Sequence, residues 1–309
     1  MTRLSIGIPI HNEEEILPEL LTRLSAVLDA IPGGPHEIVF VDDGSTDGSR
    51  RLLTAAARTD SRITIISLSR NFGHQAALGA ALDFAKGDAV VLMDGDLQDE
   101  PEIIPELVRL HQAGADVVYT RRASRKEGLL LRLAYKLYYR IVSSVAEVPM
   151  PLDSGDFSLL GARVVDALRR MPERQRYLRG LRAWVGFTQT SVDVQRGARA
   201  GGRAKYTTWR LMQLALDGIC SFSVVPLRAA TFAGLAAIAL AVAFTIYAVY
   251  VRITGGPTPA GFTASVLIMT LLSGVELLFL GVIGEYLGRI YAETKGRPPY
   301  IVAEIVGRD

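Results

Sequence analysis

Two carboxylates and an amide stand close together in the sequence Asp94-Gly95-Asp96-Leu97-Gln98, directly after an apolar run. Carboxylates one residue apart repel each other and cost stability unless a cation lies between them. Carboxylate and amide oxygens are hard ligands that suit Mg²⁺ or Mn²⁺. The spacing of Asp94, Asp96 and Gln98 therefore predicts a divalent-metal site.

Two similar polar turns lie nearer the N-terminus, at Pro9-Ile10-His11-Asn12-Glu13 and Asp42-Asp43-Gly44-Ser45-Thr46-Asp47. Asp, Ser and Gly also build turns and cap helices, and we favour that simpler role for Asp47 and Ser49. The sequence contains neither a G-x-G-x-x-G fingerprint nor a P-loop. A diphosphate bound here would therefore be held chiefly by a cation, as is usual for a nucleotide-sugar.

The elements that must position these turns are short apolar runs that alternate with amphipathic stretches. The runs are Leu4–Ile10, Glu37–Val41, Ile63–Ser67, Ala89–Met93 and Asp116–Thr120. The stretches are Glu14–Ala30, Ser49–Arg58, Gln75–Ala85 and Pro101–Ala113. This alternation predicts an α/β fold with a mostly parallel sheet. Ligands bind at the carboxyl ends of the strands in such sheets, so the three polar turns should meet at one edge.

The overall composition excludes several classes of protein. Hydrophobic residues make up 49% of the chain and charged residues 21%, which is too apolar for a disordered protein. The net charge is only +2, whereas a nucleic-acid-binding protein would need a strong basic excess. A single cysteine, Cys220, excludes an intramolecular disulfide and a multi-cysteine zinc cluster.

The apolar residues concentrate in two long stretches. Ala229–Val251 carries no charge and Gly261–Gly284 carries only Glu276, and each is long enough to cross a bilayer as a helix. We expect a transmembrane hairpin, the alternative being a buried hydrophobic hairpin. Basic residues flank the pair on both outer sides, which predicts a protein of the cytoplasmic membrane with its N-terminal region and both termini in the cytoplasm. Tyr206–Phe222 has the pattern of an interfacial amphipathic helix, or of a helix packed on the N-terminal domain.

Five motifs in order resemble those of the polyisoprenyl-phosphate glycosyltransferases, which are inverting GT-A-type enzymes. Besides the three polar turns, they are Ser154-Gly155-Asp156-Phe157 and Gly202-Arg203-Ala204-Lys205-Tyr206. The resemblance extends to Gly284-Glu285-Tyr286-Leu287-Gly288-Arg289-Ile290-Tyr291 after the second span. It implies a GT-A catalytic domain over 1–202, a basic juxtamembrane segment over 203–228, a membrane hairpin over 229–288 and a cytoplasmic tail over 289–309.

The resemblance also implies roles for individual residues. The nucleotide would be bound by Pro9, His11, Glu13, Val41, Asp43 and Asp94. The metal ligands would be Asp94, Asp96 and Gln98, and the acceptor or donor phosphate would be bound by Arg121, Arg132, Arg203 and Lys205. The family usually has Tyr where this chain has His11.

Asp156 would be the catalytic base by the same resemblance. However, a phosphomonoester has its second pKa near about 6, so a lipid phosphate hardly needs deprotonation at neutral pH. Asp156 is therefore either a base or a group that orients the acceptor or the sugar. His36, His74 and His111 lack metal-ligand spacing, and we expect them in surface or turn positions.

The implied reaction is the inverting transfer of one hexose-type sugar from a nucleotide-sugar, with UDP-glucose preferred, to polyprenyl phosphate at the cytoplasmic membrane face. Two alternatives are a processive polysaccharide synthase and a non-catalytic scaffold that binds nucleotide-sugar. The processive enzymes carry Gln-x-x-Arg-Trp, which Gln175-Arg176-Tyr177-Leu178-Arg179 does not match. Expected partners are the two substrates and the bilayer, with no nucleic acid. Glu276 is a candidate for pairing with a neighbouring subunit, which would make a homo-oligomer through the membrane helices.

Overall fold

A computed structural model describes residues 2–122, 154–171, 173, 176–194, 225–254 and 261–307. These residues form two compact units. The first contains the described residues up to Val194 together with residues 297–307. The second contains the described residues from Val225 to Gly296.

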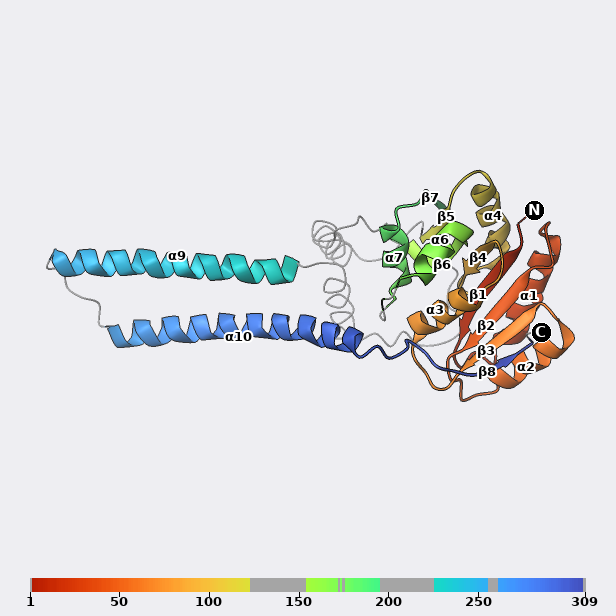
Figure 1. The fold of residues 1–309 in the computed structure, drawn as a ribbon, viewed down its shortest axis with the longest axis horizontal. Helices are drawn as coiled ribbons and strands as arrows, with labels where there is room; N and C mark the ends of the chain where they lie inside the picture. Colours follow the sequence, from red (N-terminus) through yellow and green to blue (C-terminus); the bar gives the residue numbers. More distant parts are fainter. Residues whose placement is uncertain are drawn as a thin grey trace. The chain divides into compact units, whose positions relative to one another are not determined.

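An eight-stranded mixed sheet forms the centre of the first unit, in the order β7-β5-β6-β4-β1-β2-β3-β8 (Figure 1). The strands are β1 (Leu4–Ile10), β2 (Glu37–Asp42), β3 (Ile63–Leu68), β4 (Ala89–Leu92), β5 (Val117–Arg122), β6 (Ser154–Gly161), β7 (Gln189–Val194) and β8 (Val302–Val306). Strands β4, β1, β2 and β3 run parallel, whereas β6 and β8 pair antiparallel with their neighbours. The predicted α/β architecture with a mostly parallel sheet is confirmed.

Helices cover both faces of this sheet. They are α1 (Leu17–Ala30), α2 (Ser49–Thr59), α3 (His74–Phe84), α4 (Ile104–Gln112), α6 (Ala162–Arg169) and α7 (Leu178–Trp184). Apolar residues of α1 recur every three or four positions and are buried, at Leu17, Leu20, Leu24 and Leu28. Helices α1, α2 and α4 pack into one hydrophobic core, and α3, α6 and α7 pack into another on the opposite face.

Strand β8 was not predicted from the sequence. It lies within the segment expected as a tail and pairs antiparallel with the edge strand β3. Tyr300 just before it donates a hydrogen bond from its hydroxyl to Asp83 Oδ2 at 2.9 Å, and Arg176 pairs with the same carboxylate at 3.0 Å. Burial raises the pKa of the Tyr300 hydroxyl, as does the charge of Asp83. The strand covers an edge that would otherwise offer unpaired backbone groups.

The second unit contains two long helices, α9 (Val225–Ile253) and α10 (Gly261–Thr294), which lie side by side (Figure 1). Large hydrophobic side chains are exposed along both. Among the described residues, one helical segment, Phe232–Val251, is long and apolar enough to cross a membrane. The second predicted span is helical but does not meet that criterion, so it stays a prediction. The predicted interfacial helix lies outside the described residues.

Close packing between β1 and α3 generates a test of this fold. A Cβ on Gly7 would lie 2.8 Å from Ala81 Cβ and 2.9 Å from Leu92 Cδ2. Gly7→Ala should therefore lower the free energy of unfolding by about 1–3 kcal/mol through overpacking. Gly79→Ala on the same helix is the control, because its nearest neighbour would be Arg176 Cδ at 3.8 Å. Helix propensity predicts that this control gains up to ~1 kcal/mol. Equal stability of the two variants in denaturant-induced unfolding would contradict the packing described.

Candidate functional site

Strand β1 lies between β4 and β2, so the three polar turns that follow these strands meet at one edge of the sheet. The turn after β1 contacts the turn after β2 through His11 Nδ1, which donates to the carbonyl oxygen of Asp43 at 2.9 Å. The turn after β4 packs closely on β1, because a Cβ on Gly95 would lie 3.1 Å from the carbonyl oxygen of Pro9. The structure thus brings together the turns that sequence analysis selected.

Asp43 anchors the loop that leads into α3. Its carboxylate accepts hydrogen bonds from the backbone N–H groups of Phe72 at 2.7 Å and Gly73 at 3.0 Å. The residue is buried, and the neighbouring Val41 side chain lies entirely within the core. Glu13 is tied to the start of α2, since its backbone N–H donates to Ser49 Oγ at 2.9 Å. The contacts of Asp43, Val41 and Glu13 with a nucleotide stay predictions, whereas the structure shows how each residue is held in the fold.

The turn after β4 holds the three residues predicted as metal ligands close together. Asp96 Oδ1 accepts a hydrogen bond from the backbone N–H of Gln98 at 3.1 Å. Leu97 between them adopts a left-handed backbone conformation with φ of 56°. Asp94, Asp96 and Gln98 are all partly buried. Hard oxygen ligands held in one turn fit Mg²⁺ or Mn²⁺, and the second oxygen of Asp96 has no partner among the described residues.

His74 is a site residue that sequence reasoning missed. Its Nε2 lies 3.3 Å from Asp94 Oδ1 and 3.5 Å from Asp156 Oδ2. Candidate ligand atoms of these three residues lie within 4.8 Å of one another, as in a metal site. His74 is exposed, as expected, but its ring also contacts two carboxylates that sequence analysis selected.

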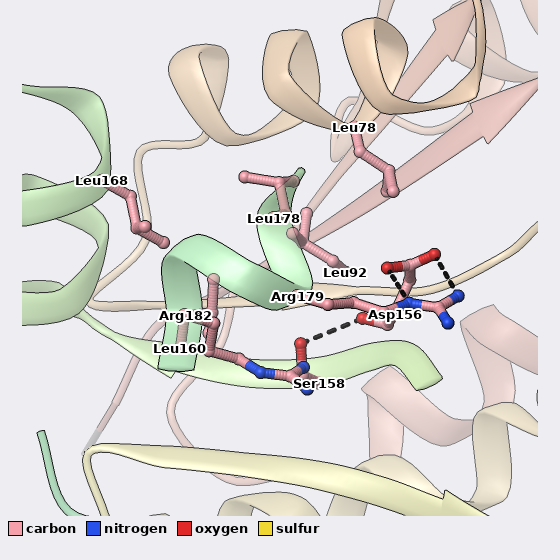
Figure 2. A pocket seen from close by; sticks show the side chains of 9 residues that line it. All are labelled: Leu78, Leu92, Asp156, Ser158, Leu160, Leu168, Leu178, Arg179 and Arg182. Carbon is pink, nitrogen blue, oxygen red and sulfur yellow. Dashed lines mark hydrogen bonds and ion pairs between the residues drawn. The ribbon is translucent and has the colours of Figure 1, made fainter. Parts of the chain in front are cut away.

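Arg179 of α7 binds both carboxylate oxygens of Asp156. Its Nε donates to Asp156 Oδ1 at 2.6 Å and its Nη2 donates to Asp156 Oδ2 at 2.7 Å (Figure 2). With both oxygens of Asp156 held by a guanidinium, the three residues form an ion-pair network with Arg179 rather than an open set of metal ligands. The assignment of Asp94, Asp96 and Gln98 as metal ligands stays a prediction.

The protonation of this network follows from its contacts. Burial opposes ionisation of Asp156, but hydrogen bonds from His74 and Arg179 outweigh it and hold the pKa of that carboxyl well below its usual range. Burial also opposes charge on His74, but Asp156 and Asp94 raise its pKa above the ordinary value. A carboxylate so strongly stabilised in its ionised form is a poor proton acceptor. These contacts favour the orienting role for Asp156 over that of a base.

Arg182 lies one helical turn beyond Arg179 on α7 and is only 3% exposed. Its Nη1 donates to the carbonyl oxygen of Gly155 at 3.3 Å, and its guanidinium lies 4.8 Å from the ring centroid of Tyr119. Its Nε and Nη2 have no hydrogen-bond partner among the residues that the structure describes. Burial lowers the pKa of Arg182 to about 10. Figure 2 shows both arginines and Asp156 lining a small pocket whose remaining walls are mostly leucine side chains.

The predicted phosphate-binding residues are only partly described. Arg121 at the end of β5 pairs with Asp193 of β7 at 2.7 Å and 3.0 Å, and both side chains are about half exposed. Such a surface pair is weak, so Arg121 can exchange it for a phosphate at little cost. Arg132, Arg203 and Lys205 lie outside the described residues.

The two arginines of α7 should respond differently to replacement. Arg179→Met leaves Asp156 as a buried charge without its main partner and should destabilise the protein by about 3 kcal/mol. Arg182→Met removes two unpartnered donors while keeping the length of the side chain, so we expect a change below ~1 kcal/mol. Denaturant unfolding followed by the fluorescence of Trp184, which ends α7, measures both. Equal losses in the two variants would be inconsistent with the pairing described.

Comparison with known proteins places this chain in a family. The sequence profile of glycosyl transferase family 2 matches residues 5–168. A glycosyltransferase of Bacillus subtilis whose role is uncharacterised is 40% identical over 98% of this chain and 94% of its own length. A prophage bactoprenol glucosyl transferase homologue of Escherichia coli is 36% identical over 98% of this chain and 99% of its own length.

A solved structure supports the fold. The mannosyltransferase PcManGT of Pyrobaculum calidifontis, in complex with GDP-Man and Mn²⁺, matches with a TM-score of 0.51 and 20% identity. The match covers 71% of this chain and 63% of that one, so this chain spans less than two thirds of its solved neighbour. The likeness is consistent with the predicted GT-A-type α/β fold. The chain belongs to glycosyl transferase family 2 and is a glycosyltransferase.

Proposed function

We propose that this enzyme transfers one hexose-type sugar, preferably glucose from UDP-glucose, to polyprenyl phosphate with inversion at the anomeric carbon. The observation that carries the proposal is the cluster at one sheet edge in which His74 Nε2 lies 3.3 Å from Asp94 Oδ1 and 3.5 Å from Asp156 Oδ2. Full-length similarity to proteins named bactoprenol glucosyl transferases supports a polyprenyl acceptor and a glucosyl donor.

Mg²⁺ or Mn²⁺, held by Asp96, Gln98 and Asp94, would neutralise the diphosphate of the donor. The chain's own groups would act on the acceptor side. A phosphate oxygen of the acceptor attacks the anomeric carbon, the bond from that carbon to the diphosphate breaks, and a nucleoside diphosphate leaves. Because the acceptor is already mostly a dianion at neutral pH, no protein group has to remove a proton. Asp156, fixed by Arg179, would orient the acceptor or the sugar hydroxyls.

The apolar helices support a place for the reaction at a membrane. The tail of a polyprenyl phosphate stays in the bilayer, so its phosphate must meet the site at the interface. The segment Phe232–Val251 is long and apolar enough to span. We propose that α10 supplies the second span, that residues 203–228 lie at the interface, and that the catalytic unit and both termini face the cytoplasm. Association into a homo-oligomer through these helices stays a prediction.

A product assay tests the proposed reaction. Membranes containing the full chain, given UDP-glucose, polyprenyl phosphate and Mn²⁺, should form polyprenyl-phosphate glucose and release UDP, and chelation of the metal should stop both. Other UDP- and GDP-sugars serve as a panel for donor choice. A protein that binds UDP but releases no diphosphate in the presence of acceptor would be a scaffold, and a growing glycan chain would indicate a processive synthase.

Replacement of Asp96 tests the metal site. Asp96→Ala should retain less than about a tenth of the wild-type turnover, a loss of at least ~1.4 kcal/mol in transition-state stabilisation. Asp96→Asn keeps an oxygen that can accept the Gln98 N–H, so it separates loss of charge from loss of the turn. Glu100→Ala is the control, because that carboxylate is exposed at the end of the same loop. Near wild-type turnover of Asp96→Ala would place the metal elsewhere.

A further inference from the structure

Four ionisable side chains from four elements form a continuous chain across the site. Asp94 follows β4, His74 begins α3, Asp156 lies in β6 and Arg179 lies in α7. His74 is the member that contacts both carboxylates, through a single nitrogen atom, Nε2. Asp94 belongs to the turn assigned to the donor, whereas Asp156 is assigned to the acceptor or sugar. The imidazole therefore connects the two halves of the reaction.

We propose that His74 is a positioning residue that fixes the position of Asp94 relative to Asp156 through the contacts of its Nε2 atom with both carboxylates. The inference rests on the proposed function and adds to it a residue that none of the motifs contains. In this role, His74 aligns the turn after β4, which carries Asp94, with the Asp156 carboxylate of β6.

The backbone supports such a role because the start of α3 is fixed. Asp43 accepts hydrogen bonds from the N–H groups of Phe72 and Gly73, directly before His74. Gly73 has φ of 97°, a conformation that side chains strongly disfavour, and this turn aims the chain into α3. The imidazole is thus attached to a backbone that is anchored to the end of β2, so its position is set by the sheet.

Charge explains why a nitrogen donor belongs at this point. Two carboxylates that approach each other repel, and the guanidinium of Arg179 is paired with Asp156. The N–H of His74 Nε2, which lies 3.3 Å from Asp94 Oδ1 and 3.5 Å from Asp156 Oδ2, offsets that repulsion. Because Arg179 holds Asp156 in place by itself, loss of His74 should displace mainly Asp94 and the turn that carries it.

Three variants distinguish the Nε2 atom from the rest of the ring. The amide nitrogen of Gln occupies about the position of Nε2, whereas that of Asn occupies about the position of Nδ1. His74→Gln should therefore stay within about threefold of wild type, while His74→Asn and His74→Ala should lose about tenfold in kcat and in affinity for UDP with Mn²⁺. The acceptor KM should change less than threefold in all three. The side chain is 45% exposed, so the thermal midpoints should remain close to that of wild type.

The readouts are calorimetry with UDP and Mn²⁺ and steady-state kinetics on the full chain. Equal losses in Gln, Asn and Ala variants, or no loss in any, would overturn the positioning role. If wild type binds UDP but transfers no sugar, the proposed function fails, and the calorimetric order of the three variants still decides the role of His74. If wild type binds neither UDP nor GDP with Mn²⁺, both proposals are wrong.

Discussion

The arrangement of the site depends on the pairing of one buried carboxylate. Asp156 has a side chain that is only 4% exposed, and an isolated charge at such a position would cost several kcal/mol. Arg179 satisfies both of its oxygens, and His74 shares one of them. The pair fixes α7 on β6 as well as the carboxylate itself. Stability and site geometry therefore rest on the same contact, so the site is organised before any ligand binds.

Small residues near β1 let α3 and the turn after β4 pack closely against this strand. Gly7 allows α3 to approach the middle of the strand, and Gly95 allows the turn of Asp94, Asp96 and Gln98 to approach its end. A Cβ on Gly95 would lie 2.5 Å from Ile10 Cδ1, which is closer than packed atoms allow. A side chain at position 95 would therefore force Ile10 or the turn to shift.

Local patterns in the sequence predicted the elements near this edge well. The stretch expected over Ser49–Arg58 is helix Ser49–Thr59, and the run Ala89–Met93 contains strand Ala89–Leu92. These segments have their own hydrophobic period and turn residues, so neighbouring positions suffice to define them.

Contacts between distant segments could not be predicted in this way. Arg179 lies 23 residues from Asp156, and Tyr300 lies 217 residues from Asp83. A lone histidine at the start of a helix has no spacing that identifies its partners, so His74 was missed although its neighbours were chosen. The arginines of α7 have one detectable signal, since positions 179 and 182 share a helix face. Strand β8 is too short and too exposed for an alternating pattern to reveal it.

The order of β8 in the chain has a consequence for synthesis of the protein. The strand is translated only after α9 and α10, yet it pairs with β3, whose own residues are made long before. Until residues 302–306 leave the ribosome, the edge of β3 lacks its β8 partner. The contacts of Arg50 with Glu304 and of Asp83 with Tyr300 form only after that point. The sheet is therefore completed last at that edge. During this interval the unpaired edge of β3 is open to pairing with another nascent chain.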